Sequence, residues 1–362
     1  MIWMMIFMVL PIVALGYVGW HFWLLLPLAG VWKTAVIAIG AACFLLLFLD
    51  LGRKLDSMPL SVAQWLYEIG TSSVIVLMYM VMIFLVADIG RLIHIVPRHL
   101  VCHSWTGTLI LATIIISLFT YGNLHYRHKY RQAVSLTTGK ALPRSYRFVM
   151  ASDLHLGYHN PRKELARWVD MFNAENADAI FIAGDIIDVS LRPLIEEDMA
   201  AEFRRLNAPV YACLGNHEYY SGQPEAIKFY QAAGIHLLRD EAAVIDSTIV
   251  VVGRDDRANM RRKPLVRLAG SVDKSKYMIL LDHQPYNLEQ AEREGFDLQL
   301  SGHTHHGQVW PASWITEAIY ECAWGKHQRG NTHYYVSSGL GIWGGKFRIG
   351  TRSEYAVITV GN

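Results

Sequence analysis

Four long apolar stretches fill the first third of the chain. Each is apolar on every side of a helix and is near the length of about 20 residues that crosses a bilayer. The stretches are Ile2–Leu28, Thr34–Leu49, Ile69–Ala87 and Ser104–Gly122. The pattern predicts a four-helix transmembrane domain over residues 1–123. A buried soluble bundle is disfavoured, because its helices would carry a polar face.

The first stretch also raises the alternative of a cleaved signal peptide. Its start lacks a basic region, its apolar run is too long, and no small-residue cleavage pattern follows it. These features favour a membrane helix.

After residue 123 the pattern becomes that of a soluble α/β protein. Residues 124–145 are basic and polar, which predicts a juxtamembrane linker that contacts anionic headgroups. From residue 146 to residue 362, short apolar runs alternate with amphipathic segments. We expect strands at 147–152, 179–183, 210–214, 243–252, 277–281, 298–300, 333–337 and 355–360, and helices at 162–173, 191–206 and 224–233.

The later strands follow one another without helices between them, so the sheet is expected to be mixed. The predicted fold is therefore an N-terminal α-helical membrane domain followed by an α/β domain. In this α/β domain, two mixed β-sheets pack face to face and are flanked by helices.

Charge and cysteine content exclude some classes of protein. The formal net charge of the 362 residues is +2, so we expect no nucleic-acid partner. No feature indicates a specific protein partner. The chain has four cysteines and no CxxC pair, so buried thiols are expected rather than a disulfide framework.

The distribution of Lys and Arg near the helix ends indicates an orientation in the membrane. With four spans, the side that holds the α/β domain carries five basic residues, which are Arg53, Lys54, Arg127, Lys129 and Arg131. The opposite side carries three, which are Lys33, Arg91 and Arg98. This asymmetry favours a cytoplasmic α/β domain.

Five short polar clusters each follow a strand-like run. They are Asp153-Leu-His155, Gly184-Asp185, Gly215-Asn216-His217-Glu218, Asp282-His283 and Gly302-His303-Thr-His305. In open α/β sheets, functional groups gather beyond the carboxyl ends of the strands. Glycine lets the backbone turn sharply there, so short side chains can point at a shared centre.

Together the clusters offer two Asp, one Asn and four His as metal ligands. Mn²⁺, Fe²⁺ and Zn²⁺ accept this mixture of oxygen and imidazole. Two metals that share a carboxylate lower the pKa of a bridging water and neutralise phosphoryl oxygens, as attack at phosphorus requires. Any one cluster could be a turn or a structural histidine. All five in order predict a site with two divalent metal ions (Mn, Fe or Zn).

The ordered set resembles the calcineurin-like metallophosphoesterase superfamily over roughly residues 145–362. It is close to a membrane-anchored bacterial branch that typically carries Gly-His-Thr-His-Gly-Gly-Gln followed by Ser-Ser-Gly-Leu-Gly. This chain has these motifs at Gly302–Gln308 and Ser337–Gly341, with His306 in place of a glycine. The histidine at position 306 would alter the local backbone conformation or the substrate contacts. The resemblance implies an integral protein of the bacterial inner membrane.

The resemblance also implies a role for each residue of the clusters. One metal would be held by Asp153, His155 and His305, the other by Asn216, His283 and His303, and Asp185 would bridge them. His217 would not bind metal but would contact the phosphoryl oxygen or protonate the leaving group. Glu218 could orient His217. His303 and His305 would thus serve different metals.

Three further features are candidates for substrate contacts. Arg348 could bind phosphate bidentately, or serve a structural role at the surface. Asp256 could position substrate, or stabilise its loop. Residues 310–324 have helical spacing with Trp314 and Ile315 on one face. That helix could pack on the core, or form an amphipathic lip beside the site that contacts the membrane or a lipid tail.

These features favour a membrane-anchored dinuclear phosphoesterase that hydrolyses a phosphodiester or pyrophosphate bond. Its partners would be membrane lipids and a phosphate-containing substrate, for which the anchor favours a lipid-linked phosphate. The alternatives are a membrane sensor or regulatory protein with a phosphoesterase-like domain, and a phosphomonoesterase acting on soluble or protein substrates. A transporter is disfavoured because the spans lack paired charges.

Overall fold

The computed structural model describes residues 2–51 and 53–362, and it divides into two compact units. Unit 1 comprises Met1–Asn123 with Gly344–Lys346. Unit 2 comprises Leu124–Trp343 with Phe347–Asn362. Each unit is described by itself below.

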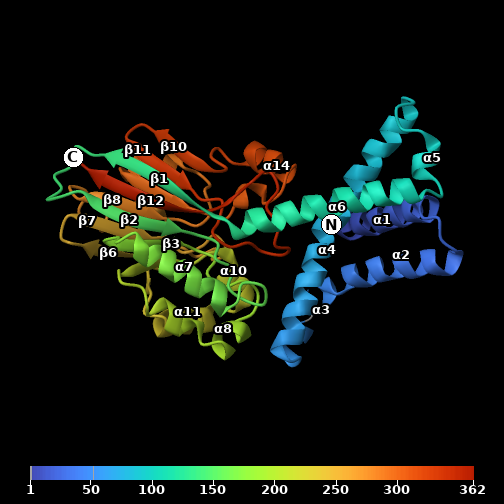
Figure 1. Ribbon diagram of the computed structural model, residues 1–362. Coiled ribbons are helices and arrows are strands. Elements are labelled where there is room, and N and C mark those ends of the chain that lie inside the picture. Colours follow the sequence, from blue (N-terminus) through green and yellow to red (C-terminus); the bar gives the residue numbers. More distant parts are fainter. Residues whose placement is uncertain (1, 52) are drawn as a thin grey trace. The chain divides into compact units, whose positions relative to one another are not determined.

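Unit 1 is helical. Its helices are α1 (Ile2–Leu25), α2 (Gly30–Leu45), α3 (Leu47–Leu51), η1 (Lys54–Ser57), α4 (Leu60–Leu92), α5 (Arg98–Val101) and most of α6 (Trp105–Arg127) (Figure 1). Helix α1 packs against α2 and α4, and the shared core includes Val18, Phe44, Leu77 and Phe84.

The described part of unit 1 has three segments long and apolar enough to cross a membrane. They are Gly30–Leu49, Leu60–Leu92 and Trp105–Arg127. Helix α1 (Ile2–Leu25) is apolar as well. The predicted apolar helices are therefore present.

Unit 2 contains two six-stranded sheets with the orders β1-β12-β2-β3-β4-β5 and β10-β11-β9-β8-β7-β6. In the first sheet β12 is antiparallel to β2, and the other neighbours are parallel. In the second sheet the outer pairs are antiparallel and the inner pairs parallel. The predicted pair of mixed sheets is confirmed.

The strands of unit 2 are β1 (Lys129–Thr137), β2 (Tyr146–Ala151), β3 (Ala179–Ala183), β4 (Val210–Cys213), β5 (His236–Leu237), β6 (Glu241–Ile245), β7 (Ile249–Gly253), β8 (Tyr277–Leu281), β9 (Leu298–Ser301), β10 (Gly325–Arg329), β11 (Thr332–Val336) and β12 (Ser353–Gly361). Its helices, besides the end of α6, are α7 (Arg162–Ala174), α8 (Arg192–Glu196), α9 (Met199–Phe203), α10 (Asn216–Ser221), α11 (Gln223–Ala232), α12 (Leu265–Ala269), α13 (Glu289–Glu294), η2 (His305–Gly307) and α14 (Ala312–Ile319).

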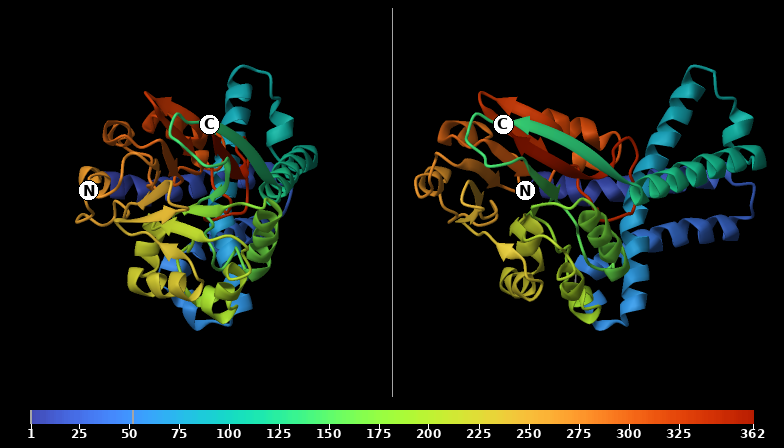
Figure 2. Two further views of the ribbon diagram at one scale, coloured as in Figure 1. Left: turned by 90° about the vertical axis from the view of Figure 1, so that its left-hand side faces the viewer. Right: turned by 60° about the vertical axis from the view of Figure 1, so that its left-hand side comes forward.

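Alternation along the strands divides the buried side chains between two faces. Phe148 and Met150 of β2 point into a core shared with Ile279 and Leu281 of β8, which fills the space between the sheets. The opposite face of the first sheet packs against α7, α9 and α11, which Figures 1 and 2 show along one side of the strands. Helices α12 and α13 cover the outer face of the second sheet. Unit 2 is thus layered α/β/β/α.

Two predicted elements are each split in the structure. The single strand expected at 243–252 is the antiparallel pair β6 and β7, which turns at Asp246 and Ser247. The single helix expected at 191–206 is α8 followed by α9, with Asp198 between them. All three residues have positive φ (48°, 58° and 48°). Asp tolerates this left-handed conformation, so the chain turns while its apolar pattern continues.

The predicted linker at 124–145 is wrong in its middle part, because Lys129–Thr137 form β1. This edge strand pairs in parallel with β12 over its whole length. Its side chains are mostly exposed or half-buried, and Val134 is the exception. A strand with one buried side chain has too little apolar alternation to be predicted. The short strands β5 and β10 were missed for the same reason.

Candidate metal centre

The predicted ligands lie on loops that follow parallel strands. Asp153 and His155 follow β2, Asp185 follows β3, and His283 follows β8. Asn216 begins α10 just after β4, and His303 and His305 follow β9. The structure gathers the Asp and His members into overlapping groups whose ligand atoms lie within 4.8 Å of one another.

The backbone at this centre is unusual. Five of the predicted ligands have left-handed conformations, with φ of +53° at Asp153, +45° at His155, +53° at Asp185, +70° at His303 and +48° at His305. Such conformations are uncommon outside glycine and cluster at functional sites. The turns aim short side chains at one point.

The first group contains Asp153, His155 and His305. The two imidazoles approach with their Nε2 atoms 3.0 Å apart. The Oδ1 atom of Asp153 lies 3.5 Å from Nε2 of His305 and 4.0 Å from Nε2 of His155. All three side chains are buried. Two imidazole nitrogens and a carboxylate oxygen thus converge on one point.

The second group contains Asp185, His283 and His303. His283 Nε2 lies 3.1 Å from Oδ2 of Asp185, and the rings of His283 and His303 are 5.2 Å apart. The same Oδ2 atom lies 3.8 Å from Nε2 of His155 in the first group. Asp185 therefore lies between the two groups, where a bridging ligand belongs.

An unpartnered polar atom tests whether these residues fit divalent cations. Oδ1 of Asn216 is buried and accepts no hydrogen bond within the described part of the chain. Leaving a buried polar atom unsatisfied costs about 1–3 kcal/mol. A cation at each group would satisfy the Asn216 oxygen and imidazole lone pairs, so the donor set fits two metals of the Mn, Fe or Zn type.

Glycines make room for the clustered side chains. A Cβ atom at Gly184 would lie 2.6 Å from Nδ1 of His283, and a Cβ atom at Gly215 would collide with the carboxylate of Asp185. Gly184 also has a φ of +82°. The centre therefore depends on these two residues lacking side chains.

The two carboxylates of the centre have opposite electrostatic environments. Burial, together with the charge of Asp185, raises the pKa of Asp153. Burial alone would also raise the pKa of Asp185, but the imidazoles of His283 and His217 outweigh it and hold that pKa well below its usual range. Burial and the charge of His283 lower the pKa of His303 to about 3, which keeps this ring in the neutral form that binds metal.

His217 stands at the edge of the centre. Its backbone amide donates to Oδ1 of Asp185 over 2.9 Å, and its Nδ1 donates to the carbonyl oxygen of Asp188 over 2.9 Å. Burial alone would lower the pKa of His217, but the charges of Asp185 and Asp188 raise it to about 9. His217 is thus protonated at neutral pH, as a general acid must be. It also forms a third group with His155 and Asp185.

Asp188 is a residue that the sequence analysis missed. Its Oδ1 atom lies 3.2 Å from Nδ1 of His155 and 3.4 Å from Nδ1 of His217, and its Oδ2 atom lies 3.6 Å from Nδ1 of His159. One buried carboxylate thus orients the metal-facing ring of His155 and the ring of His217. The signal in the sequence was a carboxylate closing the otherwise apolar run Asp185-Ile-Ile-Asp188.

The expectation that Glu218 orients His217 is wrong. The Glu218 carboxylate accepts hydrogen bonds from the backbone amides of Gly215, Asp185 and Ile187. It fastens the β3 and β4 loops to each other, and Asp188 holds His217 instead.

The structure contradicts direct substrate contacts by Arg348 and Asp256. Arg348 is fully buried, and its guanidinium donates to the carbonyl oxygens of His305 and Gly341, among others, and to Oγ of Ser353. Asp256 is also buried, and it accepts hydrogen bonds from Gln284 and the Ala258 amide. Both side chains hold loops in place.

His303 and His305 point to different groups, which strand alternation would not produce, because residues two apart lie on the same face of a strand. Strand β9 ends at Ser301, and both histidines adopt left-handed turns. His306, which departs from the motif that the sequence resembles, also has a positive φ of 49°. Its ring stacks on Trp324 at 5.2 Å, and its Nε2 lies 2.8 Å from Oε1 of Glu317. These contacts compensate for the backbone strain.

Helix α14 packs against η2 directly after the His303–His305 turn. Trp314, Ile315 and Ile319 are 61%, 62% and 57% exposed, so the helix does not bury this face in the core. The ring of Tyr320, at the end of α14, lies 6.3 Å from that of His303. The helix thus exposes an apolar face, and Tyr320, which follows it, lies close to a predicted metal ligand.

Comparison with known proteins extends these observations. Residues 146–307 match the family model described as calcineurin-like phosphoesterase. The chain is 33% identical to an uncharacterized metallophosphoesterase of Aquifex aeolicus over 58% of its own length and 83% of the relative. It is 29% identical to one of Campylobacter jejuni, with 69% of each chain covered. It is 30% identical to a Danio rerio protein called transmembrane protein with metallophosphoesterase domain, covering 71% of this chain and 63% of that one.

Solved structures with a similar arrangement are more distant. A 5'-nucleotidase precursor from Thermus thermophilus has a TM-score of 0.37 and 12% identity, covering 54% of this chain and 49% of that one. A dimetal phosphatase from Danio rerio has a TM-score of 0.37 and 12% identity, covering 54% of this chain and 87% of that one. The chain thus spans about half the length of the nucleotidase.

Proposed function

The chain belongs to the calcineurin-like metallophosphoesterase family, and from that premise we propose that it is a membrane-anchored dinuclear-metal hydrolase of phosphodiester or pyrophosphate bonds. The observation that carries the proposal is the convergence of two ligand groups on Asp185. A sensor or regulatory domain without activity would not need the complete set of metal ligands together with His217.

We assign one metal to Asp153, His155 and His305 and the other to His283, His303 and Asn216, with Asp185 shared. Bound there, two divalent metals would neutralise the phosphoryl oxygens and activate water for in-line attack. Asp188 fixes the ring of His155, and Asp153 accepts the backbone amide of His303 over 2.9 Å. These hydrogen bonds to the assigned ligands hold them in the geometry that hydrolysis needs.

In this proposal His217 supplies the proton to the leaving group. Its Nδ1 donates to the Asp188 carbonyl, so Nε2 carries the proton that is transferred. Its raised pKa keeps that proton in place at neutral pH. Proton transfer to the leaving oxygen completes cleavage of the P–O bond.

The substrate we propose is a lipid-linked phosphodiester or pyrophosphate. Two features support a lipid tail: the exposed apolar face of α14 beside His303, and the three long apolar helices of unit 1. Two similar proteins, from Danio rerio and Bos taurus, carry names that describe a transmembrane protein with this domain. A bacterial inner membrane, with unit 2 on the cytoplasmic side, agrees with the Lys and Arg asymmetry.

The test is turnover of an aryl phosphodiester by the full chain in detergent with Mn²⁺. Wild-type protein is expected to release the aryl alcohol, and Asp185→Asn to lose both turnover and the second metal. An aryl phosphomonoester, assayed in parallel, separates diesterase from monoesterase activity. An active Asp185→Asn enzyme would contradict the two-metal assignment, and an inactive wild type with two bound metals would favour a regulatory role.

A further inference from the structure

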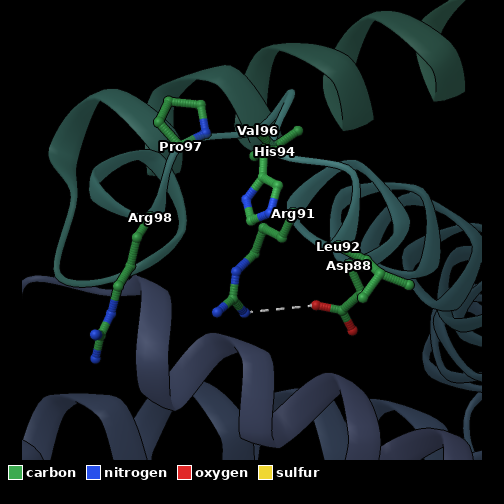
Figure 3. A pocket seen from close by; sticks show the side chains of 7 residues that line it. All are labelled: Asp88, Arg91, Leu92, His94, Val96, Pro97 and Arg98. Atoms are coloured by element: carbon green, nitrogen blue, oxygen red, sulfur yellow. Dashed lines mark ion pairs between the residues drawn. The ribbon is translucent and has the colours of Figure 1, made fainter.

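Unit 1 contains a cavity that has no part in the metal centre. It lies at the carboxyl end of α4 and the segment leading into α5, and its volume is about 440 Å³, within the range typical of ligand sites. Its lining residues, shown in Figure 3, are Asp88, Arg91, Leu92, His94, Val96, Pro97 and Arg98. Two guanidinium groups and one imidazole thus share a small space with a single carboxylate.

The carboxylate of Asp88 already has partners on helix α1. Oδ2 of Asp88 accepts the hydroxyl of Tyr17 over 2.7 Å and lies 3.0 Å from Nε2 of His21. His21 is buried and stacks on Phe84 with ring centroids 4.5 Å apart. This pairing joins α1 to α4, and the sequence analysis, which found no paired charges in the spans, did not anticipate it.

The basic side chains of the cavity have fewer partners than Asp88 has. Arg91 has one ion pair, with its Nη1 atom 3.8 Å from Oδ1 of Asp88. For the side chains of Arg98 and His94, the described residues offer no hydrogen bond or ion pair. Two arginines against one aspartate leave the cavity positive, and most guanidinium N–H groups are available to a ligand.

We propose that this cavity binds a phosphate group, in particular that of an anionic phospholipid headgroup. The planar fork of Arg matches phosphate oxygens bidentately, and Arg91 and Arg98 approach one space from different helices, as Figure 3 shows. Asp88 keeps Arg91 in place, and Tyr17 and His21 keep Asp88 in place.

The surroundings of the cavity favour a lipid over a soluble phosphate. Leu92 lines the cavity, and Leu92, Ile93 and Ile95 are exposed among its basic residues in the sequence. Apolar side chains next to basic residues are typical of the zone where headgroups meet acyl chains.

The test measures lipid binding to the full chain purified in detergent, by native mass spectrometry. The probes are phosphatidic acid, phosphatidylglycerol and phosphatidylcholine of equal chain length, with inorganic phosphate as competitor. Wild-type protein is expected to retain the two anionic lipids in preference to phosphatidylcholine. Arg98→Gln and Arg91→Gln should each lower the affinity for anionic lipid about tenfold, the effect of losing one charge-assisted hydrogen-bonded pair.

Two further variants keep the outcome interpretable. Arg98→Lys retains the charge but loses the fork, so it should bind with intermediate affinity. Lys54→Gln removes an equal charge from η1, outside the cavity, and should bind as wild type does. Displacement of lipid by millimolar phosphate would make free phosphate a second ligand of the same site. Equal losses in Lys54→Gln and Arg98→Gln, or no loss in either arginine variant, would overturn the proposal. Neither result depends on hydrolytic activity.

Discussion

Asp188 contacts two imidazole rings of the candidate metal centre, those of His155 and His217. Its substitution should therefore affect both metal binding and the proposed general acid. Its carboxylate lies 3.2 Å from Nδ1 of His155 and 3.4 Å from Nδ1 of His217. In Asp188→Asn the shape is retained, but an imidazole that binds metal loses its anionic partner. We expect metal affinity to fall roughly 10–100-fold, as is usual for such supporting residues. Isothermal titration of the metal-free protein with Mn²⁺ measures this.

The matched variant is His217→Ala, which removes the proposed acid but none of the assigned ligands. Its metal affinity should equal that of wild type, and kcat on an aryl phosphodiester should fall roughly 10²–10⁴-fold. If His217→Ala lost metal affinity as strongly as Asp188→Asn, then His217 would be a metal ligand. The distances among His217, His155 and Asp185 are also compatible with that role.

At the level of residues, the sequence predicted the polar side chains that directly follow strands. It missed the side chains that reach the metal centre from distant loops. The ligand clusters were recognisable because each follows an apolar run, and all seven predicted ligands lie in the segments that directly follow strands. Asp188 and Arg348 could not be assigned, because their roles depend on contacts between distant loops. The guanidinium of Arg348 reaches the carbonyl of His305, 43 positions away. Such contacts require the fold, not a local pattern.

Among the elements, β1 is held by an ion pair between an exposed arginine and a buried glutamate, in addition to its hydrogen bonds to β12. Arg131 of β1 donates from Nε and Nη2 to the two oxygens of Glu175, over 2.8 Å and 2.9 Å, and Tyr355 of β12 donates to the same carboxylate. The Arg131 hydrogen bonds, together with the Tyr355 hydrogen bond, outweigh the raising effect of burial and leave the pKa of Glu175 lower than usual. Since Arg131 is partly exposed, the pair should contribute roughly 1 kcal/mol.

The pH dependence of this contribution follows from the sign of the shift. A carboxyl with a lowered pKa in the folded state stabilises that state above its unfolded pKa of about 4.3, and the stabilisation is lost as the pH falls through the folded value. The intrinsic rate of amide exchange itself falls toward acidic pH, so the quantity to compare is the protection of the β1 amides relative to that intrinsic rate. This protection should decrease in wild type as the pH falls below about 4.3, and Glu175→Gln should flatten the decrease. An equal loss of protection in both proteins would show that the pair does not hold β1.

Helix α14 carries the prediction about substrate class. Trp314→Ala and Ile315→Ala remove exposed apolar area, so stability should change by less than about 0.5 kcal/mol, as for most surface substitutions. Turnover of a lipid-linked phosphodiester in vesicles should fall, while turnover of a soluble aryl phosphodiester stays unchanged. Glu317, on the same helix, pairs with His306 and is left intact, so the helix keeps its contact with the metal loop. Equal turnover of the lipid substrate in variant and wild type would contradict a lipid-binding lip.

The elements themselves were predictable wherever apolar periodicity was strong. The strands β3 and β8 occur at the predicted residues, because their side chains are buried on both faces. Elements broken by a left-handed Asp, and edge strands with one buried side chain, escaped prediction. The periodicity of apolar residues in the sequence reflects which side chains are buried. A turn within an apolar run, or a strand with mostly exposed side chains, leaves too little trace in that pattern to be predicted.

At the scale of the whole molecule, metal binding should stabilise one unit and not the other. The assigned ligands all belong to unit 2, on loops after β2, β3, β4, β8 and β9. A ligand that binds only the folded state stabilises it by about 2.7 kcal/mol at a concentration 100 times Kd. Chelation should therefore abolish turnover and speed hydrogen exchange in the strands of both sheets, while helices α1, α2 and α4 exchange as before.

Restoring Mn²⁺ should reverse both changes in wild-type protein, whereas Asp185→Asn should show a much smaller response because its shared ligand is lost. Full-length protein in detergent, analysed by hydrogen exchange with mass spectrometry, reports both units in one experiment. Exchange that accelerates equally in unit 1 would mean that the metals stabilise the whole chain as a single cooperative structure. Exchange that does not respond in unit 2 would mean that the ligand groups hold no metal, and the proposed hydrolysis would fail with them.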